Sequence, residues 1–148
     1  MITCTFEDGK TGSNRHVVID VLVVQDNKVL MVKRAPMMHL EAGKWGIIGG
    51  FVERDETLKE AAAREIFEET GYRVKNLQLL TIRDNPDRPH EDRQNVSFVF
   101  FCEAGKKEGE SDQESTEQKW FDFDHLPNPD DIAFDHYQNI QDYLSLKK

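Results

Sequence analysis

The stretch from Gly50 to Tyr72, GFVERDETLKEAAAREIFEETGY, constrains this chain more than any other, because a glycine corner there leads into a predicted helix. At about 3.6 residues per turn, the carboxylates of Glu65, Glu68 and Glu69 fall on one side of that helix. Like charges at this spacing repel one another by roughly 0.2–0.5 kcal/mol per pair on an exposed helix. The cluster is therefore interpreted either as a solvated acidic face or as a site for a cation.

The residues around the cluster favour the cation site. The paired glycines Gly49 and Gly50 allow another group to approach the backbone closely. A capping box of Thr57 and Glu60 starts the helix, and Gly71 is placed to end it. Carboxylate and carbonyl oxygens are the ligands that Mg²⁺ or Mn²⁺ prefers, usually beside water and substrate phosphates. The stretch therefore predicts a divalent-metal site for a diphosphate.

The same stretch resembles the Nudix box, G-x5-E-x7-R-E-U-x-E-E-x-G-U, in identity and spacing at every fixed position. Those positions are Gly50, Glu56, Arg64, Glu65, Glu68, Glu69 and Gly71. Ile66 fills the first bulky apolar position, whereas Tyr72 fills the second, where an aliphatic residue is usual. Ile48 also departs from the pattern, because many relatives have proline there. Both departures affect packing and the entry loop, and so bear on substrate fit more than on metal binding.

The resemblance implies a Nudix hydrolase, an enzyme that uses Mg²⁺ or Mn²⁺ to hydrolyse a nucleoside diphosphate linked to another group. It implies that Glu65 and Glu69 bind the ions. Glu68 and the carbonyl of Gly49 are implied to assist them. Hydrolysis requires water to attack phosphorus in line while charge on the oxygens is stabilised, and a metal held by this cluster would supply that stabilisation.

The resemblance also implies that Arg64 holds Glu56 and orients the helix. The general base varies across the family. In some members it matches Glu65, and in others it comes from a late loop, where the candidate in this chain is Glu114. The predicted catalytic residues are thus Arg64, Glu65, Glu68 and Glu114, and Glu114 is also a candidate metal ligand.

Two segments indicate which class of substrate the protein uses. The run from Arg83 through Arg93 and the closing LPNPDDIAFDHYQNI resemble the subset of the family that acts on ADP-ribose and related nucleotide sugars. We therefore expect hydrolysis of an ADP-ribose-like or GDP-mannose-like nucleoside diphosphate sugar to NMP and sugar phosphate. The alternatives are a nucleoside triphosphate pyrophosphatase that clears damaged nucleotides and a non-catalytic ligand sensor of the same fold. The resemblance further implies a homodimer, since many nucleotide-sugar hydrolases of the family pair subunits to complete the substrate site.

Five residues are predicted to contact the substrate: Arg34, Trp45, Phe51, Arg88 and Arg93. The polar loop over residues 84–95 holds two of these arginines, and guanidinium groups suit the recognition of phosphate and sugar hydroxyls. Alternatively, that loop is solvated and its basic residues pair with neighbouring acids. Trp45 either stacks on a ligand ring or packs in the core beside the site. His16 is interpreted as structural, with a catalytic base as the alternative.

The rest of the chain predicts a mixed sheet between helices, an α/β/α sandwich. The valine-rich segment from His16 to Val24 is typical of a strand covered on both faces, and Asp26 and Asn27 turn the chain into a second strand. The predicted strands cover residues 16–24, 28–33, 44–48, 74–83, 96–102 and 119–123, and a final helix begins at Asp130. The family resemblance implies the same fold and specifies the mixed sheet.

The acidic segment from Glu103 to Glu117, EAGKKEGESDQESTE, is predicted to be a mobile loop because it is polar and contains glycine. It is interpreted either as a purely solvated loop or as one that closes over a metal. In the second case it supplies Glu114 or Glu117 as a further ligand or base.

Composition indicates the compartment and the size of the ligand. The 148 residues predict a single domain over 1–148, and 38% hydrophobic and 32% charged residues with a mean hydropathy of −0.66 are typical of a soluble globular protein. The net charge of −9 disfavours a long nucleic acid but not a small nucleotide held by a metal. Cys4 and Cys102 are too few for a disulfide framework or a zinc site, which favours a cytoplasmic protein. The N-terminal MITCTFEDGK and the interruption of the longest apolar run by Asp20 predict no signal peptide and no membrane span.

Overall fold

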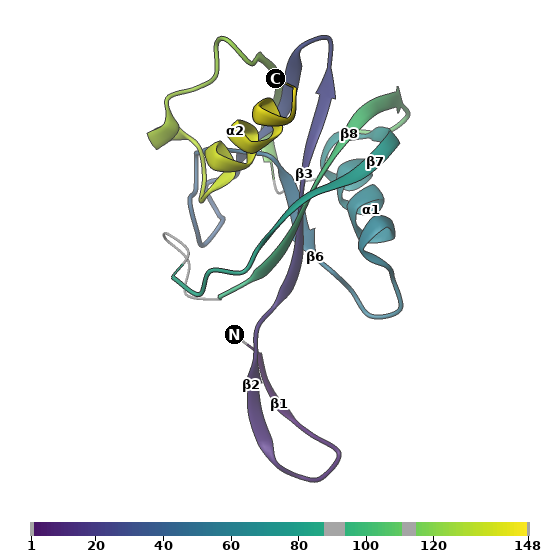
Figure 1. Cartoon of the computed structure of the whole chain (residues 1–148), viewed down its shortest axis with the longest axis vertical. Coiled ribbons are helices and arrows are strands. Elements are labelled where there is room, and N and C mark those ends of the chain that lie inside the picture. Colours follow the sequence, from purple (N-terminus) through teal and green to yellow (C-terminus); the bar gives the residue numbers. More distant parts are fainter. Residues whose placement is uncertain (1, 88–93, 111–114, 148) are drawn as a thin grey trace.

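The computed structural model of the protein describes residues 2–87, 94–110 and 115–147 (Figure 1). The elements follow the chain as β1 (Ile2–Thr5), β2 (Thr11–Asn14), β3 (Val17–Gln25), β4 (Lys28–Arg34), β5 (Trp45–Gly46), β6 (Ile48–Phe51), α1 (Leu58–Thr70), β7 (Tyr72–Arg83), β8 (Val96–Lys107), β9 (Ser115–Asp122), a 3₁₀ turn (Pro129–Asp131) and α2 (His136–Leu146). Seven of the strands form one sheet, while β1 and β2 form a separate hairpin.

Strand β3 is the centre of the sheet. Along one edge it runs parallel to β8, and along the other it pairs antiparallel with β6 near its start and with β4 near its end. The sheet continues through β7 beyond β8, and through β5 and β9 on β4. Helices α1 and α2 cover opposite faces (Figure 1). The predicted mixed sheet and α/β/α sandwich are therefore confirmed.

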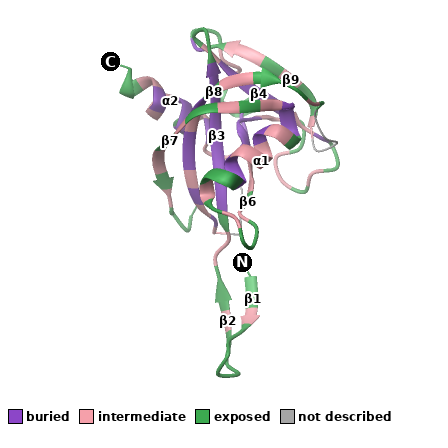
Figure 2. Cartoon of the chain, turned by 90° about the vertical axis from the view of Figure 1, so that its right-hand side faces the viewer, coloured by how far each residue is buried: buried purple, intermediate pink, exposed green. Residues whose placement is uncertain are grey.

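The two faces of β3 supply two separate hydrophobic clusters, and the strand is buried along nearly its whole length (Figure 2). Ile19, Val21 and Val23 point toward α1, and Leu22 and Val24 point toward α2, as the period of two in a strand requires. Asp20 interrupts the apolar row on the α2 side and is only 6% exposed. A carboxylate in such a place needs partners.

Helix α1 has the boundaries that its sequence predicts. The Thr57 hydroxyl accepts from the Glu60 N–H, and the Glu60 carboxylate accepts from the Thr57 N–H, which completes the capping box. Gly71 ends the helix in a left-handed conformation, with φ of 74°. Asp26 and Asn27 are also left-handed, and they form the predicted turn between β3 and β4.

Four expectations need correction. The segment predicted as a mobile loop is largely strand, because β8 continues to Lys107 against β7 and β9 begins at Ser115 against β4. The predicted strand over residues 44–48 is divided, since β5 pairs with β4 and β6 with β3. Helix α2 begins at His136 rather than Asp130, because Phe134 has a φ of 53° that a helix cannot contain. The structure also adds the hairpin β1–β2, which the sequence did not predict.

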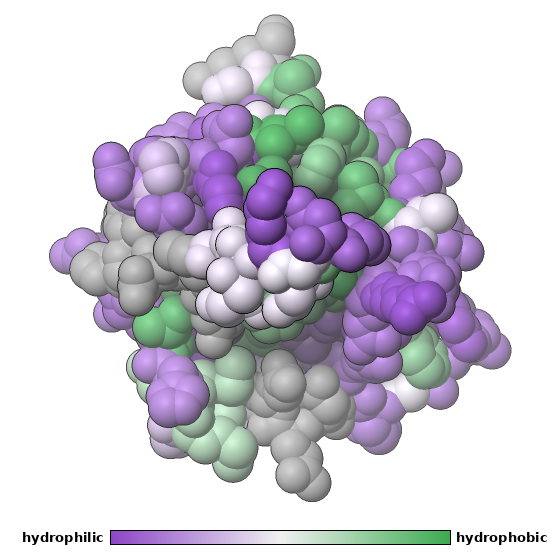
Figure 3. Space-filling model, turned by 90° about the horizontal axis from the view of Figure 1, so that it is seen from below, coloured by the Kyte–Doolittle hydropathy of each residue, from purple (hydrophilic) through white to green (hydrophobic). Residues whose placement is uncertain are grey.

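The hairpin projects away from the sheet (Figure 1). At its base, Arg15 donates hydrogen bonds to the carbonyls of Gln94, Asp84 and Asn95 and so ties the hairpin to the residues that follow β7 and precede β8. Seen from the hairpin end, the surface shows apolar side chains gathered next to polar ones (Figure 3). Ile2, Phe6 and Val17 are each more than 40% exposed. Across the described part of the chain, no helix combines the length and the apolar character that a membrane span needs.

Candidate active site

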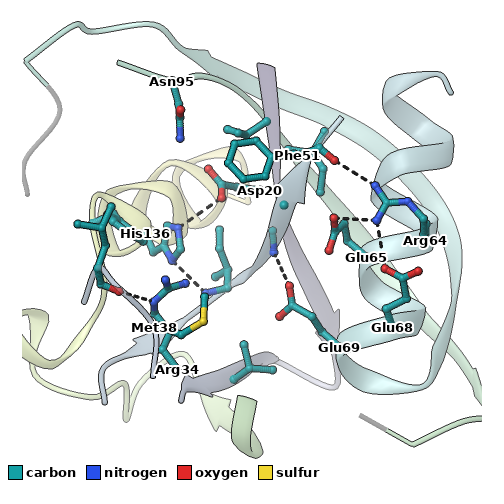
Figure 4. A pocket seen from close by; sticks show the side chains of 18 of the residues that line it. Asp20, Arg34, Met38, Phe51, Arg64, Glu65, Glu68, Glu69, Asn95 and His136 are labelled. Atoms are coloured by element: carbon teal, nitrogen blue, oxygen red, sulfur yellow. Dashed lines mark hydrogen bonds and ion pairs between the residues drawn. The ribbon is translucent and has the colours of Figure 1, made fainter. Parts of the chain in front are cut away.

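A pocket of about 530 Å³ lies between α1, β6 and the segment that enters α2 (Figure 4). The predicted glutamates Glu65, Glu68 and Glu69 all line it, and so do Gly49 and Arg64. The structure thus brings together three glutamates and the arginine of the box, with Gly49 beside them.

Strand β6 uses one edge to pair with β3 and leaves its other edge to side chains. The N–H of Gly49 donates to Glu69 Oε1 at 3.3 Å, and the carbonyl of Phe51 accepts from Arg64 Nη2 at 3.0 Å. In an antiparallel pair, the N–H and C=O of one residue point to the same side. The carbonyl of Gly49 is therefore directed to the same edge as its N–H, where the carboxylates lie.

The carboxylates differ in exposure. The Glu65 side chain is 15% exposed, that of Glu68 is 49% exposed, and Glu69 as a whole residue is 7% exposed. A Cβ atom at Gly50 would lie 2.0 Å from Glu65 Oε1, so any larger residue there would force the Glu65 carboxylate to move. Three carboxylates and a backbone carbonyl around one pocket fit a hard divalent cation. Glu65, Glu68, Glu69 and the carbonyl of Gly49 would hold it.

Arg64 organises the acidic group. Its guanidinium binds Glu56 through two hydrogen bonds, of 3.1 Å from Nε and 2.8 Å from Nη2. Nη1 donates to Glu65 at 2.8 Å and to Glu68 at 3.1 Å. The hydrogen bonds to Glu56, followed by those to the other two carboxylates, raise the pKa of Arg64. The hydrogen bonds from Arg64 in turn lower the pKa of Glu56, so this pair is ionised at neutral pH.

A second polar group lies in the same pocket on the α2 side of the sheet. Asp20 accepts from the Ser97 hydroxyl and lies 3.4 Å from His136 Nε2. His136 Nδ1 accepts from the N–H of Ile47 at 3.2 Å. Sequence reasoning missed this group as a site. The available signal was Asp20 itself, an acid inside an otherwise apolar strand, whereas nothing in the sequence distinguishes His136.

The predicted substrate contacts divide into three kinds. Arg34 and Phe51 line the pocket, with the Arg34 guanidinium 5.1 Å from the centre of the Phe134 ring. Trp45 does not line it and packs edge-on against Phe121 at 4.9 Å, as the core-packing alternative predicts. Arg88, Arg93 and the candidate base Glu114 lie outside the described residues. His16 packs against the Phe51 ring at 5.0 Å.

The family model for the NUDIX domain matches residues 14–143. The chain therefore belongs to the Nudix hydrolase family, as the box predicts.

Three known proteins illustrate the relationship. An ADP-ribose pyrophosphatase of Methanocaldococcus jannaschii is 37% identical over 131 residues, which cover 88% of this chain and 74% of that protein. The NAD-capped RNA hydrolase NudC of Escherichia coli is 33% identical over 74% of this chain and 40% of its own. A bifunctional NMN adenylyltransferase/ADP ribose pyrophosphatase of Francisella tularensis, solved with AMP and a Mn ion, has a TM-score of 0.72 and 27% identity. The match covers 91% of this chain and 42% of that one.

Proposed function

We propose that this protein hydrolyses the diphosphate of an ADP-ribose-like or GDP-mannose-like nucleoside diphosphate sugar, giving NMP and sugar phosphate, with Mg²⁺ or Mn²⁺. The observation that carries the proposal is the pocket, where Glu65, Glu68, Glu69 and Gly49 lie together. Its support from known proteins is the 37% identity to an ADP-ribose pyrophosphatase over most of both chains. The AMP and Mn ion in the Francisella tularensis structure show that a protein of this fold can be crystallised with both.

The reaction places distinct demands on the residues of the pocket. Water attacks one phosphorus atom, the bond from that atom to the bridging oxygen breaks, and the attacking water gives its proton to a base. A divalent ion, when bound, neutralises charge on the phosphate oxygens. Arg64 keeps Glu56 and the backbone of Phe51 in place, so the helix stays aligned with β6. The pocket walls position the two phosphates and limit the access of water.

We assign the base to Glu65 or Glu114. Glu65 is in the pocket, where its Oε1 accepts from Arg64. Glu114 precedes Ser115, which pairs with the pocket residue Arg34. Glu117 of β9 pairs with Lys33 of β4, and its replacement provides the matched control for a change at Glu114. If Glu114 is the base, Glu114→Gln lowers kcat far more than it raises KM while Glu117→Gln changes little. A silent Glu114→Gln returns the role to Glu65.

The substrate assignment is tested with a panel of nucleoside diphosphate sugars, dinucleotides and NTPs, each with Mg²⁺ and Mn²⁺. Chromatography of the products separates the candidate functions. NMP plus sugar phosphate supports the proposal. NMP plus pyrophosphate supports the nucleoside triphosphate pyrophosphatase, and binding without turnover supports the sensor. We propose Arg34 and Phe51 as substrate contacts because they line the pocket, and the roles of Arg88 and Arg93 stay predictions.

We further propose that the protein is a homodimer. A two-stranded hairpin on its own is marginally stable in water, yet β1–β2 extends away from the sheet with Ile2 and Phe6 more than 40% exposed. A second copy would cover such residues. Light scattering at micromolar concentration should give twice the 17.2 kDa mass of one chain, and a mass of 17.2 kDa would exclude the dimer.

A further inference from the structure

The segment that carries the metal-site backbone is enclosed by functional side chains from both helices. A Cβ atom at Gly49 would lie 2.6 Å from Asp20 Oδ1, and one at Gly46 would lie 3.3 Å from His136 Nδ1. A Cβ atom at Gly50 would lie 2.0 Å from Glu65 Oε1. The glycines of this segment thus lie directly against Asp20, His136 and Glu65, and no side chain separates the backbone from them.

Two backbone N–H groups where the chain enters β6 are bound by side chains of different helices. Glu69 of α1 accepts from the N–H of Gly49, and His136 of α2 accepts from the N–H of Ile47, two residues earlier. Ile47 joins β5 to β6 and belongs to neither strand, whereas Gly49 is the second residue of β6. The Glu69 carboxylate and the His136 ring therefore hold the backbone on either side of Ile48.

The orientation of His136 is fixed by its own partners. Because Nδ1 accepts from Ile47, a neutral ring carries its proton on Nε2, which faces Asp20 Oδ1. The other Asp20 oxygen accepts from Ser97, a fully buried residue of β8. The resulting chain of contacts runs from β8 through β3 and α2 to the backbone of Ile47. Its members lie in the interior, since Asp20 and His136 as whole residues are 6% and 4% exposed.

An alternative interpretation is that Asp20 and His136 bind a metal ion. Among the described residues, ligand atoms of Asp20, Asp135 and His136 lie within 4.8 Å of one another. A metal on His136 Nε2 would displace the proton there while Nδ1 still accepts from Ile47, which requires an anionic imidazole ring. The hydrogen bonds thus favour a proton, not an ion, between His136 and Asp20.

We propose that His136, oriented by Asp20, is a positioning residue that fixes the backbone from Ile47 to Gly49 for metal binding. This inference rests on the proposed metal site at the Gly49 carbonyl. When Glu69 turns toward an ion, the Gly49 N–H can lose its bond to that carboxylate. His136 then keeps this backbone in place through its hydrogen bond from the N–H of Ile47. Removing Asp20 or His136 therefore lets the backbone from Ile47 to Gly49 move, which displaces the carbonyl of Gly49.

The test compares Asp20→Ala and His136→Ala with two reference variants. Asp20→Asn keeps an oxygen for the His136 N–H, and the Ser97 hydroxyl can turn to accept from the new amide. Asn139→Ala also changes a buried polar residue of α2, one that bonds Arg83 and not β6. All variants are assayed well below their melting temperatures, so loss of stability alone does not alter the readouts.

Three measurements distinguish positioning from general stability. Calorimetric titration with Mn²⁺ should show affinity weakened about tenfold or more in both alanine variants of the pair, as is typical when the support of a metal ligand is lost. Hydrogen exchange at the Ile47 and Gly49 amides should accelerate in the same two variants. With ADP-ribose, kcat should fall about tenfold or more while KM changes little. Asp20→Asn should restore most of each value, and Asn139→Ala should alter only the melting temperature.

Unchanged Mn²⁺ affinity and amide exchange in Asp20→Ala and His136→Ala would overturn the inference. The same is true if Asn139→Ala reproduces their effects. The outcome for the proposed function is separate, because it depends on wild-type turnover of the substrate panel. A wild-type protein that turns over no diphosphate refutes the function, while amide exchange still reports whether His136 holds the segment.

Discussion

Helices α1 and α2 bring polar side chains to one pocket under different conditions. On α1 the exposure is graded, since the side chains of Arg64 and Glu68 are 25% and 49% exposed, that of Glu65 is 15% exposed, and Glu69 as a whole residue is 7% exposed. On the α2 side, those of His136 and Asp20 are 5% and 8% exposed. Groups near water can exchange one charged partner for another at small cost, whereas removing one member of a buried pair leaves the other uncompensated. Arg64 and Glu68 of α1 are thus suited to change partners when a metal binds, and the α2 group is suited to hold the backbone.

The largest expected effect comes from changing the carboxylates of α1. Replacing Glu69 or Glu65 by Gln keeps the size of the side chain and removes the charge that a cation needs. We expect kcat to fall by roughly 10²-fold or more, about 2.7 kcal/mol of transition-state stabilisation, measured by steady-state kinetics with Mg²⁺ and Mn²⁺. Near wild-type turnover in both variants, with metal still required, would place the site elsewhere.

The next effect concerns the end of α1. Gly71 is left-handed, and a Cβ atom there would lie 2.0 Å from the carbonyl oxygen of Gly109. Gly43 is also left-handed, but a Cβ atom there meets nothing within 4 Å. We expect Gly43→Ala to cost about 1–2 kcal/mol for the backbone conformation alone, and Gly71→Ala to cost about 1–3 kcal/mol more for the displaced backbone. Urea unfolding measures both, and equal losses would show that the contact with Gly109 is unimportant.

A smaller effect follows from the Arg64–Glu56 pair. Arg64 lowers the pKa of Glu56 in the folded protein, so the pair stabilises the fold above the unfolded pKa of a glutamate. This contribution is lost as the pH falls through the lower, folded value. We expect the stability of the wild type to drop below about pH 4.5, and that of Glu56→Gln to drop less, by on the order of 1 kcal/mol. Parallel curves of unfolding free energy against pH for the two proteins would contradict this assignment.

The smallest effect examines how tightly α1 covers its face of the sheet. Cys102 packs in the cluster beneath α1, and burial raises the pKa of its thiol to about 12. Cys4 lies in the hairpin and is partly exposed. At pH 8, a thiol reagent should leave Cys102 of the native protein unmodified and should modify both cysteines in denaturant, counted by mass spectrometry. Rapid native labelling of Cys102 would show that the α1 side opens readily.

The two helices also differ in how well the sequence predicts where they begin and end. The limits of α1 are set by neighbours in the chain, since Thr57, Glu60 and Gly71 act within a turn of its ends. Helix α2 starts after the left-handed Phe134, and its first residue, His136, bonds Ile47 and Asp20, which are distant in sequence. Its N-cap, Asp135, makes no side-chain capping bond that sequence could reveal. The box therefore predicts the carboxylates of the site, while their counterpart on the α2 side depends on the fold.

The sequence also did not predict where β8 ends. The polar residues after Cys102 are typical of a loop, yet Glu103 and Ala104 pair with Lys75 and Val74 of β7. Their backbone hydrogen bonds depend on a partner strand some thirty residues away in sequence, and composition carries no record of that pairing. The hairpin β1–β2 escaped prediction for a related reason, since its short strands bury little and so lack an apolar pattern.

The side chains on the edge of β6 also affect how the protein behaves at high concentration. An unpaired strand edge offers free N–H and C=O groups to the strands of other molecules, which is a common route to aggregation. In β6, Glu69 accepts from the N–H of Gly49 and Arg64 donates to the carbonyl of Phe51, while His136 accepts from the N–H of Ile47 just before the strand. The residues of the pocket thus also protect the edge from pairing with another chain. Variants that abolish activity by removing them are expected to be less soluble than their stability alone would suggest.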